Sequence, residues 1–345
     1  MTLLKQKERE FEYDAMRMIA AVAVIAIHSS SMCGADIDIF SFQRTVLTGY
    51  CVLCFFSVPL FFMISGHFCL DTEHGNDAKY IFKKILRLVT AFLFWSLIYA
   101  IENSLTADSL RSSWKQILFE FFTGEYHMWF LFAIVCLYLI TPLLKPIAVD
   151  DKLCKYFLLL FFTFQLLLPA ISNIPHIGIL IDEFLKKTQM KFVIGYSGYY
   201  LLGSFLSKRT LSKKTAIICY ALGIIGAVYS VVAVLRASRS VGFVDITLAE
   251  YLTWNVAAET IAIFVFISRR FKNKSCKVIT FISKYSFGIY LSHPLILWIF
   301  SLIGFMPDFI NPLVGVPVVT ASATVISLLF SMLLRKIPKL GKLIT

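Results

Sequence analysis

Residues 14–32 read DAMRMIAAVAVIAIHSSSM, and this stretch holds the pattern from which the fold is inferred. It is almost entirely apolar, and it is long enough to cross the roughly 30 Å hydrocarbon core of a bilayer as a helix. Asp14, Arg17 and His28 interrupt the apolar run. Ionisable side chains inside such a helix are costly, so each of them predicts a functional site or a contact inside the protein.

Arg17 and His28 are predicted to lie on one face of this first helix. The helix rotates by roughly 1100° from Arg17 to His28, within about 20° of three full turns, and it rises about 16 Å over the same residues. Asp14 is close enough to pair with Arg17. One interpretation is a path in which Arg17 holds an anionic donor and His28 transfers a proton. A snorkelling arginine and a histidine hydrogen-bonded between helices explain the spacing equally well.

The whole chain shares this apolar character. Of its 345 residues, 58% are hydrophobic and 16% are charged, whereas ordinary soluble domains have about 45–50% and about 25%. This composition excludes a single soluble domain, a disordered chain and a small disulfide-linked secreted module. The net charge of +12 comes from short basic clusters between apolar runs. That placement favours cytoplasmic loops of a membrane protein, so no nucleic-acid partner is expected.

The apolar runs predict an all-α polytopic membrane protein with about ten transmembrane helices. Helices are favoured over barrel strands because the runs are long and do not alternate. With a cytoplasmic N-terminus, roughly three quarters of the Lys and Arg residues fall at inner ends, so both termini are predicted to be cytoplasmic. No signal peptide or further domain is expected, and 1–345 is predicted to be one transmembrane domain. The predicted spans are 14–32, 45–70, 86–104, 127–149, 156–173, 190–207, 215–236, 250–268, 278–303 and 312–334.

Two further histidines are predicted to approach His28 in the outer half of the protein. His293 lies about as deep in its span as His28 does, and His127 begins a span that starts on the outer side. A hydrogen bond between helices explains His293 equally well, and the aromatic belt competes as the explanation for His127 beside Trp129. The remaining histidines are expected to be solvated surface residues: His67, His74 and His176.

Lys83, Lys84 and Arg87 form a basic segment that could hold the phosphates of an anionic donor. The positive-inside rule explains the same cluster without any ligand. Glu259 lies deep in a predicted span and could line a cavity or pair with a buried cation, so its role stays open. No metal-ligand cluster, nucleotide-binding loop or nucleophile elbow is present in the sequence, and no metal is expected.

Five motifs, in order, resemble those of the membrane-bound acyltransferase-3 family. They are Asp14-x-x-Arg17 with His28 further on, FFMISG at 61–66, KKILR at 83–87, HMWFL at 127–131 with YLITP at 138–142, and YSFGIYLSH at 285–293. The resemblance covers nearly the whole chain and implies a bundle of about ten helices in the bacterial cytoplasmic membrane. It also implies transfer of an acyl group, usually acetyl, from cytosolic acyl-CoA to a hydroxyl of a cell-envelope glycan or lipid-linked sugar.

The resemblance implies roles for individual residues. Arg17 would contact the donor, acetyl-CoA, and His28 would be the catalytic base. The basic segment Lys83, Lys84 and Arg87 is expected to assist in donor binding. The expected substrate-binding residues are His127, Trp129, Ser286, Tyr290 and His293.

The sequence is also compatible with a different function. The membrane part of vancomycin-resistance serine racemases is also similar, and there the implied role is serine uptake. A transporter would equally place an arginine and a histidine along its substrate path. No racemase domain is expected in this chain, which weakens the transporter alternative. A non-catalytic scaffold for envelope assembly is the third hypothesis.

Overall fold

The computed structural model describes residues 10–33, 37–71, 78–106, 114–172, 174, 178–189 and 194–345. All regular structure in these residues is helical, because a backbone in lipid must satisfy its hydrogen bonds within its own segment. The helices are α1 (Phe11–Ser31), α2 (Phe42–Leu53), α3 (Ser57–Leu70), α4 (Ala78–Thr106), α5 (Trp114–Thr123), η2 (Tyr126–Met128), α6 (Trp129–Val149), α7 (Asp151–Leu160), η3 (Phe161–Leu167), α8 (Leu168–Ile171), α9 (Gly178–Thr188), α11 (Ser197–Ser207), α12 (Lys213–Val241), η4 (Thr247–Ala249), α13 (Trp254–Phe271), α14 (Lys277–Leu302), α15 (Pro312–Leu334) and α16 (Gly341–Ile344).

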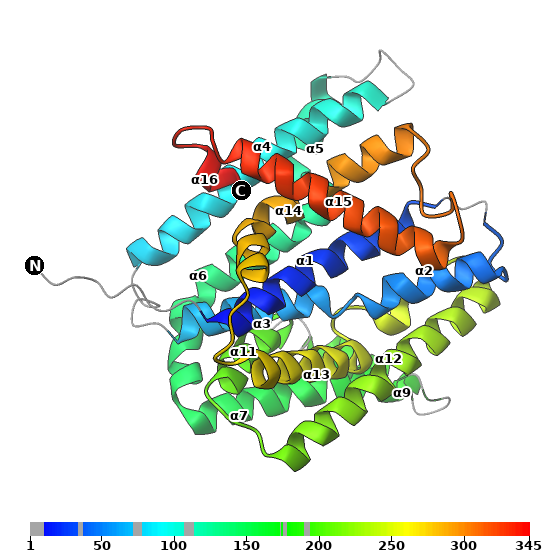
Figure 1. The fold of residues 1–345 in the computed structure, drawn as a ribbon. Helices are drawn as coiled ribbons and strands as arrows, with labels where there is room; N and C mark the ends of the chain where they lie inside the picture. The colour runs from blue at the N-terminus through cyan, green and yellow to red at the C-terminus, as the bar shows by residue number, and fades with distance from the viewer. Residues whose placement is uncertain are drawn as a thin grey trace, which may run out of the picture.

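Helix α1 runs through the middle of the bundle (Figure 1) and contacts α2, α3, α13, α14 and α15. Most of its residues are buried. Two polar contacts join it to its neighbours: Ser283 of α14 donates a hydrogen bond to Asp14 (2.8 Å), and the hydroxyls of Ser29 and Thr320 of α15 lie 2.8 Å apart. Such side-chain hydrogen bonds help membrane helices associate where apolar surface alone gives no preference over lipid.

Among the described residues, seven helical stretches are long and apolar enough to cross a membrane. An eighth is α14, which is bent by 67° between Lys284 and Ser286. The protein is therefore a multi-pass membrane protein with seven to eight candidate spans, and the predicted number of ten is not confirmed. The seven stretches are 42–70, 78–104, 114–149, 151–171, 213–241, 247–271 and 312–334.

The two predicted spans without a counterpart, 14–32 and 190–207, correspond to the interior helices α1 and α11. Ionisable groups and serines lower the hydropathy of α1, and α11 has only 11 residues. Residues 197–204 of α11 are all buried. Both helices are covered by protein, so neither needs the length or the apolar composition that lipid requires.

Helices α3 and α11 pack with their backbones in contact. A Cβ atom added at Gly66 would overlap the backbone carbonyl of Tyr200, and one at Gly203 would overlap that of Met63. Small residues commonly permit this close approach between membrane helices. Gly66 belongs to the FFMISG motif, so a part of that motif has a packing role.

One end of the bundle collects basic segments from several helices, and we call it the basic end. The end of α11 meets the end of α3 there, where Lys208 lies 2.7 Å from Asp71. The end of α15 meets the bend of α14, because Arg335 donates a hydrogen bond to the carbonyl of Lys284 (3.3 Å). The positive-inside rule predicts that this end faces the cytoplasm.

Candidate active site

A cavity of about 390 Å³ opens beside Arg17. We call it the basic cavity, because Arg17 of α1 shares it with Lys84 and Arg87 of α4. Ser286 and Tyr290 of α14 line the same cavity. Apolar and aromatic side chains form most of the remaining wall: Phe61, Ile64, Phe68, Leu88, Phe130, Ile134, Tyr138 and Phe287.

Aromatic rings and an internal ion pair hold the cations of this cavity in place. Arg17 Nη1 lies 3.2 Å from Asp14 Oδ1, and its guanidinium carbon lies 4.5 Å from the ring centroid of Phe68. Lys84 Nζ lies 4.9 Å and 5.2 Å from the ring centroids of Tyr80 and Tyr138. Fixed cations at the edge of an apolar cavity suit an anionic, polyphosphate ligand.

The predicted basic segment divides between two environments. Lys83 is exposed and does not line the basic cavity, whereas Lys84 and Arg87 do. Arg87 also donates a hydrogen bond to the carbonyl of Thr345 (2.8 Å) and lies over the Phe287 ring. The alternation follows from the helix, because residues one position apart point about 100° away from each other.

A second cavity, of about 270 Å³, lies at the other end of α1 and is lined by His28. We call it the acidic cavity, because Glu102 of α4 and Glu125, which precedes η2, share it with His28. The rest of its wall comes from the residue after α1 and from α4, η2 and α14: Met32, Tyr99, Asn103, Tyr126, Pro294, Leu297, Trp298 and Ser301.

His28, His127 and His293 converge between the two cavities. The ring centroids of His28 and His293 are 5.2 Å apart, and those of His127 and His293 are 5.5 Å apart. His127 is 3% exposed and His293 is fully buried. The predicted approach of the three histidines is therefore confirmed. Among the described residues, no group of three or more His, Cys, Asp or Glu side chains is arranged to hold a metal ion.

The hydrogen bond of His293 defines the state of its ring. Nδ1 lies 2.6 Å from the carbonyl oxygen of Tyr290, and a carbonyl only accepts, so Nδ1 carries the proton. Nε2 of His293 is buried and has no hydrogen-bond partner among the described residues. In the neutral ring this nitrogen presents a lone pair within the histidine cluster.

One stripe of α14 forms a wall of both cavities. Ser286, Tyr290, His293 and Leu297 recur at intervals of three or four residues, which places them on one helix face. Ser286 and Tyr290 line the basic cavity, and Leu297 lines the acidic cavity. The Tyr290 ring lies 5.6 Å from that of His127 and 6.0 Å from that of His293. Arg17 and His28 thus face one side of α1, as their spacing predicts.

Some candidate residues lie elsewhere. Trp129 lines neither cavity; it lines a separate cavity of about 330 Å³ and stacks on Tyr251 with ring centroids 5.6 Å apart. Glu259 is 8% exposed, lines neither cavity, and has one carboxylate oxygen without a hydrogen-bond partner among the described residues. His74 and His176 lie outside the described residues.

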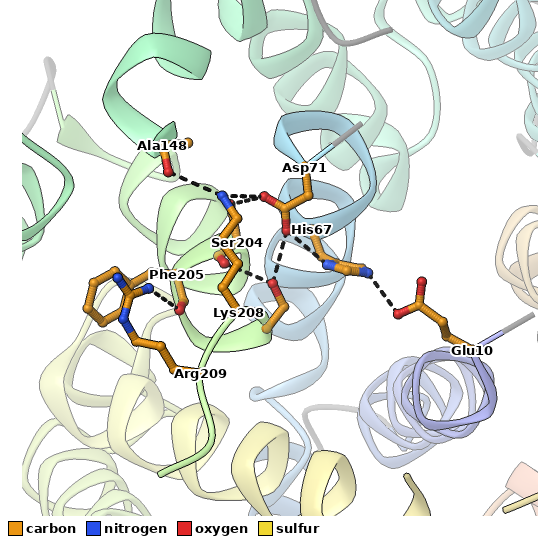
Figure 2. Close-up of polar contacts among 9 residues, drawn as sticks. Glu10, His67, Asp71, Ala148, Ser204, Phe205, Lys208 and Arg209 are labelled. Carbon is orange, nitrogen blue, oxygen red and sulfur yellow. Dashed lines mark hydrogen bonds and ion pairs between the residues drawn. The ribbon is translucent and has the colours of Figure 1, made fainter. Parts of the chain in front are cut away.

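The expectation that His67 is a solvated surface residue is wrong, because its ring is buried. Its Nδ1 lies 3.0 Å from Asp71 and its Nε2 lies 3.1 Å from Glu10 (Figure 2). The ring also stacks on Tyr13, with centroids 4.2 Å apart. Spacing along the sequence places Asp71 one turn after His67, but Glu10 is 57 positions away and could not be assigned as a partner.

Asp71 is the centre of this cluster, which we call the Asp71 clamp. Besides His67, it accepts hydrogen bonds from Lys208 (2.7 Å), Ser204 (2.5 Å) and Ser207 (3.0 Å). Burial alone would raise the pKa of Asp71, but the hydrogen bonds from His67, Lys208 and Ser204 outweigh it and hold the pKa below its ordinary value. The clamp joins the ends of α3 and α11 to the start of α1, a few residues before Arg17.

These features define a multi-pass membrane protein whose central helix borders a basic cavity at one end and a histidine-containing acidic cavity at the other. The chain belongs to the acyltransferase-3 family, since the family model described as an acyltransferase domain matches residues 10–335. This membership confirms the resemblance inferred from the motifs.

More specific relatives are distant. The chain is 22% identical, over 256 residues, to the "Probable poly-beta-1,6-N-acetyl-D-glucosamine export protein" of Staphylococcus aureus strain MSSA476. The protein of the same name from strain MW2 gives the same identity. Each match covers 70% of this chain and 69% of the relative. No solved structure matches the chain.

Proposed function

We propose that this protein is an integral-membrane O-acyltransferase of the bacterial cytoplasmic membrane. It moves an acyl group, acetyl in our proposal, from cytosolic acyl-CoA to a hydroxyl of a cell-envelope glycan or lipid-linked sugar. The observation that carries the proposal is the placement of Arg17 and His28 on one face of the buried helix α1. Each borders a different cavity, and the histidine cluster lies between the two.

The basic cavity is the proposed donor site. Arg17, Lys84 and Arg87 line it and would pair with the phosphates of acyl-CoA. Aromatic and aliphatic side chains form the rest of the wall, which suits the less polar arm that carries the thioester. The positive-inside rule favours a cytoplasmic location for this end of the bundle, and acyl-CoA is available there in our proposal.

The acidic cavity is the proposed acceptor site, and the chemistry takes place beside His28. His28 removes the proton of the acceptor hydroxyl while the oxygen attacks the thioester carbonyl. The carbon–sulfur bond then breaks, the sulfur leaves with its electron pair, and the proton on His28 neutralises the thiolate. General base catalysis of this kind typically contributes about 10²–10⁴ in rate.

Transfer in proteoliposomes tests this function. Labelled acetyl-CoA and an acceptor glycan are supplied on opposite sides of the membrane, and the product is measured by mass spectrometry. His28→Ala is expected to lower kcat by at least about a hundredfold. Arg17→Ala is expected to raise KM for acetyl-CoA, whereas Arg270→Ala, which alters an exposed arginine outside both cavities, leaves it unchanged. Undiminished transfer by His28→Ala rejects the mechanism.

A transport function is the second candidate, because the Staphylococcus relatives are named as a probable export protein. Small-solute uptake, such as that of serine, belongs to the same class of alternative. The same proteoliposomes separate these functions from acyl transfer. A transporter moves labelled serine or glycan across the membrane without consuming acetyl-CoA, and its product carries no added acetyl mass.

A further inference from the structure

Two carboxylates in the acidic cavity have no role in the proton transfer proposed for His28. Glu102 comes from α4 and Glu125 from the segment before η2, so separate parts of the chain bring them to one cavity. Asn103 donates a hydrogen bond to Glu125 (3.2 Å), which fixes the position of that carboxylate. Both side chains are partly buried, beside the imidazole that is proposed to activate the acceptor.

The other groups in the cavity suit a sugar. Tyr126 lies with its ring centroid 5.1 Å from that of His28, and Tyr99 and Trp298 complete an aromatic lining. Carboxylates and an amide can bind ring hydroxyls, while aromatic faces pack against the apolar face of a sugar ring. A volume of about 270 Å³ is slightly below the usual range of about 300–1,000 Å³ for small-molecule sites. The cavity therefore fits roughly one sugar unit.

A fully buried polar atom lies next to His28, which lines the acidic cavity. Nε2 of His293 lacks a hydrogen-bond partner among the described residues, and its ring lies against that of His28. Buried polar groups are normally paired, so an unpaired one against the ring of His28 supports a ligand bound beside His28.

The charge of the cavity restricts which ligand can enter. Its described lining includes two glutamates and neither Lys nor Arg. A phosphate or uronate on the acceptor would be repelled by negative charge in a partly desolvated site, where electrostatic repulsion is stronger than in water. The basic cavity has the opposite charge, so the two cavities favour different classes of ligand.

We propose that Glu102 and Glu125 select uncharged or cationic sugar acceptors and exclude anionic ones. The proposal deepens the acyltransferase function and rests on the acidic cavity being its acceptor site. Glu125, held by Asn103, orients the sugar through its hydroxyls, and Glu102 adds a second carboxyl group to the same cavity.

Three soluble probes of equal length test the proposal in reconstituted protein. They are the neutral N-acetylglucosamine trisaccharide, its cationic de-N-acetylated form, and the neutral form carrying one sulfate on a terminal sugar. Wild-type protein is expected to have kcat/KM at least about tenfold higher for the first two than for the sulfated one. The Glu102→Gln, Glu125→Gln double variant is expected to reduce this preference to less than about threefold, with an unchanged KM for acetyl-CoA.

The glutamine variants keep the size of each side chain, and their elution from a sizing column checks that they fold. Glu183→Gln, at an exposed ion pair with Lys186, is the matched control and keeps the full preference. The selectivity proposal is overturned if the double variant retains the wild-type ratio, or if wild-type protein accepts the sulfated trisaccharide equally well.

A binding measurement without acetyl-CoA separates this proposal from the proposed function. Trp298 lines the acidic cavity, so its fluorescence reports occupancy, and Trp298→Phe identifies its signal. Charge-selective binding without transfer would overturn the acyltransferase function and leave the acidic cavity as a sugar site. Transfer without charge selectivity would overturn only the selectivity. Absence of both binding and transfer for all three probes would overturn both proposals.

Discussion

Replacing Asp71 by alanine tests whether the Asp71 clamp holds the start of α1 in place. The change removes the carboxylate that accepts hydrogen bonds from Lys208, His67 and two serines, so the lysine and the imidazole lose this anionic partner. Breaking a buried ion pair costs about 3–5 kcal/mol. The Asp71 side chain is 10% exposed but that of Lys208 is 38% exposed, so solvent screens part of the interaction. We therefore expect a loss of about 2–3 kcal/mol.

Thermal unfolding in detergent measures this loss. An unfolding entropy of about 2.1 cal/mol/K per residue over 345 residues converts it into a decrease in Tm of about 3–4 °C. Asp182→Asn alters an exposed carboxylate of α9 and is the matched control, with a change within about 0.5 kcal/mol. An unchanged Tm at neutral pH for Asp71→Ala would show that the clamp does not stabilise the fold.

The pH dependence supplies an independent check. The pKa of Asp71 is held below its ordinary value, so its contribution to stability is complete above the unfolded pKa of about 3.9. The contribution is lost as the pH falls through the lower folded pKa. The difference in Tm between wild type and Asp71→Ala is therefore expected to be constant from pH 7 to pH 5 and to shrink only in stronger acid. A difference that disappears by pH 6 would refute this reasoning.

Three further predictions concern the cavities and the packing around them. Lys84→Ala removes a charge-assisted contact and is expected to raise KM for acetyl-CoA by about tenfold, whereas Lys83→Ala, which alters an exposed lysine, leaves this KM unchanged. Steady-state kinetics measure both values, and a larger effect of Lys83→Ala would place the donor outside the basic cavity. Gly66→Ala is expected to lower Tm, because the new Cβ overlaps the backbone of α11. Gly49→Ala is the control, since its new Cβ has no atom within 4 Å, and an equal Tm for the two variants would contradict the close packing. His293→Phe removes the Nε2 lone pair beside His28 and is expected to lower kcat with an unchanged KM for acetyl-CoA; an unchanged kcat would exclude this nitrogen from the reaction.

The sequence was sufficient to predict the helical membrane class and the shared face of Arg17 and His28. Both depend on local properties: hydropathy along the chain and the angle between residues of one helix. The number of spans was less predictable, because apolar composition does not distinguish a helix that faces lipid from one that faces protein. Helix α11 is an example, since its residues 197–204 are buried although they appear within a predicted span.

The partition of the site between two cavities could not be predicted from one sequence. Ser286, Tyr290 and His293 belong to one motif and one face of α14, yet the first two line the basic cavity and the third contacts His28. A helix spacing gives the face on which a residue lies, but the neighbouring helices decide which cavity that part of the face borders. For the same reason Trp129, close to His127 in sequence, lines a different cavity.

The polar residues of α1 and its position in the bundle have a common physical explanation. Asp14, Arg17 and His28 would each be costly on a helix that faces lipid. In this bundle, α14 supplies a hydroxyl to Asp14, Arg17 pairs with Asp14 and lies over Phe68, and His28 contacts the ring of His293. A helix surrounded by α2, α3, α13, α14 and α15 can keep ionisable groups that border interior cavities. Arg17 and His28, which supply the proposed chemistry, are among the residues that lower the hydropathy of α1, so a drop in hydropathy within an otherwise apolar helix is a useful sign of an interior site.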